Sequence, residues 1–357
     1  MSSGSPVRCY TEWDPLEEAV IGVIDGAAIP AYELATQATM PQAHREMFAL
    51  HGGEPFARRL VEAAAAELDG FAATLEAAGV TVRRPERADH SRPFSTPSWS
   101  SPGSLSAAFA RDVMLVLDDE IIEVPMGFRY QYHSMDPFRP IVTDYWRRGA
   151  RWTAAPRPLL TDASYNPDYA AAPGFDPGGS AVTEVEPLFE AGDMVKCGRD
   201  LLVQPSHVTN RTGIEWLRRH LGDRFRVHEV VFDDRHPMHI NATFLPLRPG
   251  TVLANPLRVK ELPKPFASWD MLLAPEPAIP DDHPMFLSSK WVSMNVLSLD
   301  PETVVVEAGE TGLIALLESA RFTVVPVPFR HVNTFGGAFH CATSDVRRRG
   351  ALQDYLS

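Results

Sequence analysis

The sequence predicts an α/β fold in which ββαβ-like units repeat around a closed ring. Two β-rich runs joined by turn-forming residues recur along the chain, helical patterns lie between these pairs, and no Gly/Ser-rich linker divides the 357 residues. Repeated units that each bury one face against a neighbour favour closure into a ring. We therefore expect residues 1–357 to form a single domain.

The strand pairs are expected at four places in chain order, each with turn formers such as Gly198 or Pro249-Gly250 between its two runs. They are 112–125 (DVMLVLDDEIIEVP), 193–205 (DMVKCGRDLLVQP), 241–256 (NATFLPLRPGTVLANP) and 293–308 (SMNVLSLDPETVVVEA). An N-terminal run at 19–24 is a candidate for a fifth unit.

Helical periodicity separates these pairs. Residues 56–78 place apolar side chains on one face and are followed by Gly79, a typical stop signal. Further helices are predicted at 210–221 and at 310–320, the last followed by a β-rich run at 322–327. The stretch 163–186 is rich in Pro, Gly, Asp and Ala and is expected to be a long surface loop.

The charge balance favours small molecules as ligands. A net charge of −13 and a pI near 5.4 make binding to nucleic acid or to an anionic membrane unfavourable. The N-terminal residues lack an apolar signal core, and no run approaches the ~20 apolar residues that a membrane helix needs. The sequence therefore predicts a cytoplasmic protein.

One of the three cysteines stands in an unusual context. Cys9 and Cys197 are interpreted as small buried hydrophobic residues, whereas Cys341 closely follows the pair Gly336-Gly337. Paired glycines allow a close backbone approach to a ligand, so we expect Cys341 to be exposed at a site and to act as a thiolate. Without a CxxC or Cys/His metal spacing, neither a metal nor a cofactor is predicted.

Each predicted strand pair begins with a polar residue: Asp112, Asp193, Asn241 and Ser293. Equivalent strand ends of a pseudo-symmetric ring converge near its axis, so these residues are candidates for one site. The alternative is that strand ends are polar because they meet solvent.

His239, which precedes Asn241 by two residues, can exchange protons near neutral pH, and a nearby acid such as Asp193 would orient it. From the residues alone, Cys341, His239 and Asp193 are one of several possible catalytic sets.

Ordered blocks over nearly the whole chain resemble the glycine and inosamine-phosphate amidinotransferases. They include EWDPLEEAVIG (12–22), GDMVKCGRD (192–200), VTNRTGIEWLRRHLG (208–222), PMHINATF (237–244) and GGAFHCATSDVRRRG (336–350). The resemblance implies the pentein fold, a five-fold pseudo-symmetric ββαβ propeller with a central active site. It also implies that 1–357 is one catalytic domain, which transfers an amidino group from L-arginine to an amine through an S-amidino-cysteine intermediate. The bias toward Ala, Arg and Pro suggests bacterial secondary metabolism.

The resemblance also implies roles for single residues. Cys341 matches the nucleophile, His239 the general acid/base and Asp193 its acidic partner. The substrate-binding residues expected from the matching motifs are Asp112 and Asn241 for the guanidinium, Arg258 and Ser289 for the donor's α-carboxylate, and Arg129.

The chain departs from the family pattern at and near the residues expected to bind the substrate. Asn241 replaces an aspartate, so one charge that would offset a guanidinium is missing. Ala110 and Ala338 replace a proline and a glycine, and Gln131 and Ser134 replace charged residues. Two alternatives therefore remain open: a diverged cysteine transferase for an acyl, amide or thioester donor, and a binding protein with little turnover. A hydrolase that uses water as acceptor is disfavoured by the transferase-specific blocks. The acceptor amine is not predicted, and a homodimer is an open alternative.

Overall fold

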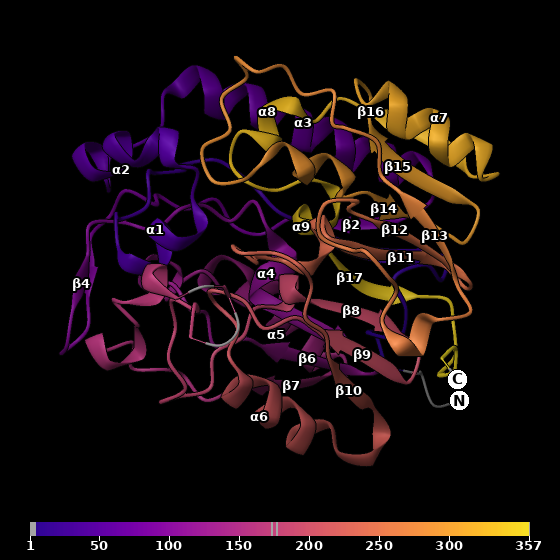
Figure 1. Ribbon diagram of the computed structural model, residues 1–357, viewed down its shortest axis with the longest axis horizontal. Coiled ribbons are helices and arrows are strands. Elements are labelled where there is room, and N and C mark those ends of the chain that lie inside the picture. The colour runs from indigo at the N-terminus through magenta and orange to yellow at the C-terminus, as the bar shows by residue number, and fades with distance from the viewer. Residues whose placement is uncertain (1–4, 173, 176–177, 357) are drawn as a thin grey trace.

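The computed structural model describes residues 5–172, 174–175 and 178–356. Its framework consists of five three-stranded sheets, each built to one plan (Figure 1). The first strand pairs antiparallel with the second, and the second pairs parallel with the third. This repeated plan is the predicted ββαβ ring.

Four of the sheets follow one another along the chain. Their strands are β5 (Met114–Leu117), β6 (Glu120–Glu123) and β7 (Arg151–Ala154); β8 (Met194–Cys197), β9 (Asp200–Val203) and β10 (Arg226–Glu229); β11 (Phe244–Arg248), β12 (Thr251–Ala254) and β13 (Asp270–Leu273); and β14 (Leu297–Ser298), β15 (Thr303–Glu307) and β16 (Thr323–Val327). The first two strands of each sheet lie within the four predicted strand pairs.

The fifth sheet joins the two ends of the chain. Strand β1 (Leu16–Ile21) pairs antiparallel with β17 (Thr343–Arg348) and parallel with β2 (Thr81–Arg83). The N-terminal run therefore does belong to a fifth unit. The first strand of that unit is β17, which comes from the C-terminal end of the chain. Described residues near the two ends of the chain consequently lie side by side, and Arg8 forms a β-bridge with Arg347 (Figure 1).

Helices lead from the second strand to the third in four of the five units. They are α3 (Arg58–Ala77), α5 (Arg139–Arg147), α6 (Arg211–Leu221) and α7 (Thr311–Ser319); the β11–β13 unit has only the turn η9 (Lys264–Phe266) at this place. The three predicted helices are confirmed within two residues, whereas α5 and β7 were not predicted. Asn210 caps α6 by accepting a hydrogen bond from the backbone N–H of Gly213 at 2.8 Å.

The remaining regular elements are short. They include α1 (Leu34–Thr39), α2 (Arg45–His51), α8 (Arg330–Asn333) and the strands β3 (Phe94–Ser95) and β4 (Ser100–Ser101). The predicted loop at 163–186 contains the turn η5 (Tyr169–Ala171) and no strand in its described part, while residues 173 and 176–177 lie outside the described residues. No helix in the described ranges has the length and apolar character needed to cross a membrane.

Short helical turns precede the first strand of every sheet, and they position the site. They are α4 (Ala110–Val113), η6 (Ala191–Asp193), η8 (Ile240–Ala242), η10 (Lys290–Met294) and α9 (Phe339–Ala342). Neighbouring turns pack against one another around the axis, and the backbone N–H of His340 donates to Asn295 O at 3.4 Å, which links α9 to the end of η10. The predicted convergence is therefore real, although the polar residues at 112, 193, 241 and 293 all lie in turns and not in strands.

Aromatic packing fixes the turn that carries Cys341. The ring of Phe339 in α9 stacks on that of Phe329 with a centroid distance of 4.1 Å and meets Phe71 of α3 edge-on at 5.0 Å. All three side chains are buried. Helix α3 thus anchors α9 from outside the ring through contacts that favour a single orientation.

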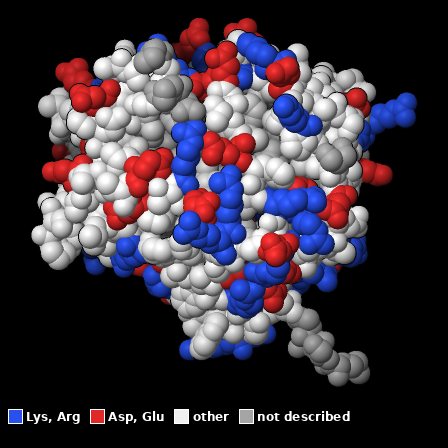
Figure 2. All heavy atoms as spheres, turned by 60° about the horizontal axis from the view of Figure 1, so that its bottom comes forward, with Lys and Arg blue, Asp and Glu red and all other residues white. Residues whose placement is uncertain are grey.

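Positive and negative side chains intermingle on the face that carries α6 (Figure 2). Glu215, for example, pairs with Arg219 at 2.8 Å and with Arg218 at 3.8 Å. Exposed pairs of this kind contribute little to the free energy of unfolding. Because acidic side chains lie among the basic ones, the face in view has no broad basic area.

Candidate active site

Cys341 lies in α9 at the floor of a cavity of about 590 Å³. Its side chain is buried, yet Cys341 lines the cavity together with His239, Asn241 and Asn295. The preceding glycines permit this position. Gly336 has a φ of +98°, and a Cβ atom on Gly337 would lie 2.3 Å from the ring of Phe109. Cys341 was expected to be exposed at a site; it is buried, although it does line the cavity.

Two side-chain amides face the sulfur of Cys341. The Nδ2 atoms of Asn295 and Asn241 lie 3.3 Å and 3.5 Å from Sγ. Asn295 also accepts a hydrogen bond from the backbone N–H of Cys341 through Oδ1 at 3.1 Å. Oδ1 of Asn241 lies 3.8 Å from Sγ and can accept from a thiol, whereas the two shorter N–H contacts favour a thiolate.

The imidazole of His239 also lies close to the sulfur, between two carboxylates. Its Nε2 atom is 2.9 Å from Oε2 of Glu190, and its Nδ1 atom is 3.6 Å from Oδ1 of Asp112. A carboxylate oxygen of Asp112, a ring nitrogen of His239 and Sγ of Cys341 all lie within 4.8 Å of one another. Burial alone would lower the pKa of His239, but Asp112, the contact with Cys341 and Glu190 outweigh it and hold the pKa well above its usual value.

Asp193 does not contact this imidazole, contrary to the expectation that it would be the acidic partner. Its Oδ1 atom accepts the backbone N–H of His239 at 2.9 Å, and its Oδ2 atom accepts the hydroxyls of Ser206 and Thr209, each at 2.6 Å. The backbone of His239 has a φ of +55°, a strained conformation for a residue with a side chain. Asp193 thus holds the backbone of His239, while Glu190 meets its ring.

The two carboxylates beside the ring are poorly solvated. Burial raises the pKa of Asp112 to about 6 and that of Glu190 to about 7. Oδ1 of Asp112 and Oε1 of Glu190 are buried and have no hydrogen-bond donor among the described residues. Such oxygens are favourable partners for a ligand that brings its own N–H groups.

Two of the other predicted substrate-binding residues, Arg258 and Ser289, line the cavity wall. Nε of Arg258 lies 3.0 Å from Oδ2 of Asp234, and its NH1 donates to the hydroxyl of Thr243 at 3.1 Å. The guanidinium of Arg258 is thereby oriented within the wall. Ser293, expected at the mouth of its strand, is buried and does not line the cavity; Asn295 of the same unit does so.

Arg129 does not line this cavity, and its role in substrate binding stays a prediction. Its guanidinium donates to the carbonyl oxygen of Leu160 and pairs with Asp162, both at 2.8 Å. It also lies over the ring of Tyr165, 5.0 Å from the centroid. These contacts point the side chain toward a separate cavity of about 250 Å³.

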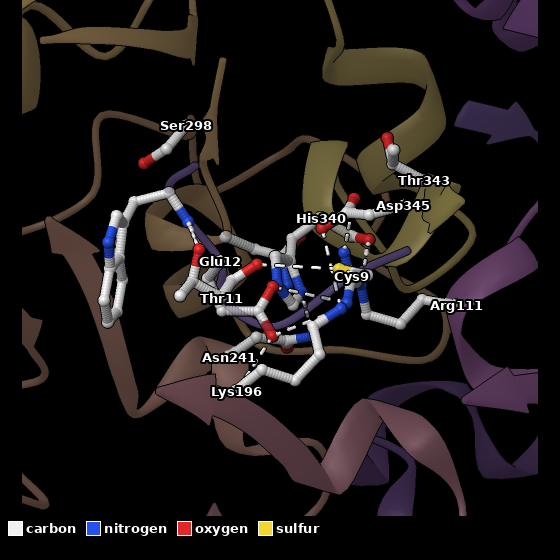
Figure 3. A network of polar contacts seen from close by, with 12 residues as sticks. Cys9, Thr11, Glu12, Arg111, Lys196, Asn241, Ser298, His340, Thr343 and Asp345 are labelled. Carbon is white, nitrogen blue, oxygen red and sulfur yellow. Dashed lines mark hydrogen bonds and ion pairs between the residues drawn. The ribbon is translucent and has the colours of Figure 1, made fainter. Parts of the chain in front are cut away.

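A buried network of charges lies beneath the turn of Cys341 (Figure 3). Arg111 pairs with Asp345 at 2.9 Å and with Glu12 at 3.4 Å, and Lys196 lies 3.6 Å from Glu12. Nε of Arg111 donates to the carbonyl oxygen of His340 at 2.9 Å. Because every charge has an opposite partner, the network is tolerated in the interior and fixes the residue next to Cys341.

Two residues of the site, Glu190 and Asn295, were not assigned from the sequence. Nor was the contact beneath it, in which Nε2 of His340 lies 2.9 Å from Oε2 of Glu12. Glu190 is three residues before Asp193 in the sequence. The two acids differ only in that Glu190 precedes the turn η6, whereas Asp193 lies in it. Asn295 follows Ser293 by two residues, as Cys341 follows Phe339, so the repeat gave a weak signal for it. No sequence signal connects Glu12 to His340.

The fold and the site together define a pentein, with a cysteine and a histidine facing each other at the centre of a five-sheet ring. No family model matches the chain. Individual relatives do match it. The L-arginine:L-lysine amidinotransferase of Pseudomonas savastanoi pv. phaseolicola is 44% identical over 352 residues, which cover 99% of this chain and 97% of that protein. The mitochondrial glycine amidinotransferase of Danio rerio is 43% identical over 359 residues, covering 98% and 85%. The chain belongs to the amidinotransferase family and is a transferase.

Solved structures agree with this assignment. An amidinotransferase of Microseira wollei in the saxitoxin biosynthetic pathway superposes with a TM-score of 0.89 at 43% identity, covering 98% of this chain and 99% of that one. The inosamine-phosphate amidinotransferase of Streptomyces griseus gives a TM-score of 0.89 at 36% identity, covering 99% and 100%. DDAH from Pseudomonas aeruginosa, with a TM-score of 0.58 at 13% identity over 92% and 98% of the two chains, shares the fold.

Proposed function

We propose that this protein transfers an amidino group from L-arginine to an amine acceptor, with Cys341 as nucleophile and His239 as general acid and base. The observation that carries the proposal is the position of the Cys341 sulfur, which lies within 4.8 Å of a ring nitrogen of His239 and 3.3 Å from the amide nitrogen of Asn295. A thiolate and an imidazolium in contact are the reactants that such a transfer needs.

The carboxylates behind the ring suit a guanidinium. Oδ1 of Asp112 and Oε1 of Glu190 have no donor among the described residues, and the N–H groups of a guanidinium supply them. At the other end of the donor, Arg258 and Ser289 of the cavity wall would bind an α-carboxylate. Together these contacts would hold the guanidinium carbon next to the sulfur. Substrate binding would thereby place the two reacting atoms in the orientation that the reaction needs.

In the first half-reaction, the thiolate of Cys341 attacks the guanidinium carbon and a C–S bond forms. The C–N bond to the donor's chain then breaks, and His239 gives its proton to the departing nitrogen, so that ornithine leaves as a neutral amine. Cys341 retains a cationic S-amidino group, and His239 is left neutral. The total charge of the reacting groups is unchanged.

In the second half-reaction, the neutral acceptor amine attacks the amidino carbon. The C–N bond forms, His239 takes a proton from the attacking nitrogen, and the C–S bond breaks to regenerate the thiolate. Burial of Cys341 and His239 limits the access of water, which favours the amine as acceptor.

The amide of Asn241 argues against the alternative of a neutral carbonyl donor. In that alternative its N–H groups would donate to the donor's oxygen. Its Nδ2 atom instead lies 3.1 Å from Nδ1 of His340 and 3.5 Å from Sγ of Cys341, so both hydrogens already have acceptors. The guanidine donor therefore remains the better-supported choice.

The proposed acceptor is an amino-acid amine, because donor and acceptor would occupy the same cavity and Arg258 offers a carboxylate site to both. Two relatives are named for transfer to L-lysine and for glycine amidinotransferase activity. The proposal includes a role in secondary metabolism, as stated for the Microseira wollei protein.

Intact-protein mass spectrometry tests the proposal. Incubation with L-arginine should add one amidino group to Cys341, and L-lysine or glycine should then discharge it. The Cys341→Ala variant is the matched control, because the remaining thiols, Cys9 and Cys197, are buried away from the cavity. An arginine-treated protein without the adduct, despite turnover of another donor, would contradict the proposal.

A further inference from the structure

Asn241 makes two contacts, with His340 and with Cys341, that the proposed transfer does not explain. Asn241 lies on the cavity floor and is buried, with its amide directed at two acceptors. We propose that Asn241 and Asn295 form an amide cradle that holds the sulfur of Cys341 as a thiolate, with the neutral ring of His340 fixing the orientation of Asn241. The inference deepens the proposed function and rests on Cys341 being the nucleophile.

The orientation of His340 follows from its partner, Glu12. Nε2 of His340 lies 2.9 Å from Oε2 of Glu12. Burial would raise the pKa of Glu12, but Lys196, Arg111 and His340 outweigh burial and lower it, so Glu12 is an ionised carboxylate that can only accept. The proton of His340 must therefore reside on Nε2.

Neutrality of His340 then fixes the amide of Asn241. Burial and, after it, the repulsion from Arg111 lower the pKa of His340 to about 4, so the ring carries a single proton at neutral pH. Its Nδ1 atom presents a lone pair, and the group 3.1 Å away on Asn241 must be the NH₂ end. The second hydrogen of this NH₂ group is directed to Sγ of Cys341, with a nitrogen–sulfur distance of 3.5 Å.

Asn295 is oriented independently by the backbone. Its Oδ1 atom accepts the backbone N–H of Cys341 at 3.1 Å, so the Nδ2 atom 3.3 Å from Sγ must be the donor. Neither amide can be reversed without placing an oxygen against another acceptor. Two N–H groups thus converge on one sulfur, an arrangement suited to an anion.

The cradle serves both half-reactions. A thiolate is the attacking group in the first and the leaving group in the second, and N–H donors favour the anion each time. An aspartate at position 241, as in the family pattern, cannot donate and would place a negative charge beside the sulfur. The other titratable groups around Sγ are His239 and Asp112 across the floor and His340 behind Asn241.

The test is the pH dependence of Cys341 alkylation by iodoacetamide in the full-length protein without substrate, read by intact mass. Asn241→Asp and Asn295→Asp replace a donor by an acceptor without changing size, and the carboxylate introduced by Asn295→Asp can still accept the backbone N–H of Cys341. Each should move the alkylation midpoint to higher pH and lower the rate at pH 7 about tenfold or more. Asn241→Leu, which adds no charge, should produce a smaller shift in the same direction.

Asn166→Asp is the matched control, because this amide donates to the carbonyl oxygens of Gly178 and Ser180 and does not line the cavity. Its alkylation profile should equal that of the unmodified protein. An unchanged or lowered midpoint in both Asn241→Asp and Asn295→Asp would overturn the cradle. Alkylation needs no turnover, so this result stays distinct from a failure of the arginine adduct to form.

Discussion

Replacing Glu190 by glutamine removes the charge that faces Nε2 of His239 while keeping the size of the side chain. The contact is 2.9 Å long. Two unit charges at this distance attract by about 6 kcal/mol at an effective dielectric constant near 20, before desolvation is subtracted. Measured hydrogen bonds to charged groups retain about 1.5–3 kcal/mol. We therefore expect the pKa of His239 to fall by about 1–2 units in Glu190→Gln.

The pH profile of the first half-reaction detects this change. His239 must be protonated to give its proton to the departing amine, so the rate of adduct formation falls as the pH rises through its pKa. Because the carboxylates raise this pKa, removing one should move the alkaline limb to lower pH by about 1–2 units. Rapid quenching after mixing with L-arginine, followed by intact mass, gives the rate at each pH.

Asp193→Asn separates the two acids. Asp193 accepts from the backbone of His239 and from two hydroxyls, so Asp193→Asn should lower the free energy of unfolding by about 1–3 kcal/mol. It should move the alkaline limb less than Glu190→Gln does, because its carboxylate attracts the imidazolium without a hydrogen bond to the ring. Denaturant unfolding measures the first effect. A limb that moves in Asp193→Asn but stays fixed in Glu190→Gln would refute the assignment of Glu190 to the ring.

Three further predictions concern the cavity. A Cβ at position 192 would lie 2.7 Å from Oδ1 of Asp112 and 2.8 Å from the ring of His239. Gly192→Ala should therefore displace both side chains and lower kcat about 100-fold. Unchanged steady-state kinetics would contradict this prediction, because they would show that the ring is free to move. Arg258→Ala should weaken L-arginine binding about 10- to 150-fold through the lost carboxylate contact, measured by calorimetry, whereas equal affinity would remove Arg258 from the donor site. In a Cys341→Ala background, Asn241→Asp should tighten L-arginine binding by about 1–3 kcal/mol because it adds a charge, and weaker binding would mean that position 241 does not face the guanidinium.

Local patterns were sufficient to predict most of the framework. The four strand pairs and the helices at 56–78, 210–221 and 310–320 depend on neighbouring residues, namely β-rich runs, turn formers and helical periodicity. Strand β7 was missed because it is short and only partly buried, with an exposed residue at each end, so it lacks a continuous apolar signal. Helix α5 was missed although its buried residues Ile141, Val142 and Tyr145 follow helical spacing; it is short and has Pro140 in its first turn.

The sequence by itself also determined the chemistry of the centre: a cysteine beyond a glycine pair, a histidine and several acids at equivalent places of a repeat. Only the tertiary structure decided which acid meets the ring. Glu190 and Asp193 are three residues apart in one turn, which directs one to the imidazole and the other to the backbone of His239, 49 and 46 positions away in the chain.

The same holds for Arg129, which packs against Leu160 and Asp162, and for the amide of Asn241, whose direction depends on Glu12, 328 positions before His340. Such contacts depend on how distant turns are brought together around the axis. Local propensity carries no information about them, because each is decided by burial and hydrogen bonding between segments that meet only in the closed ring.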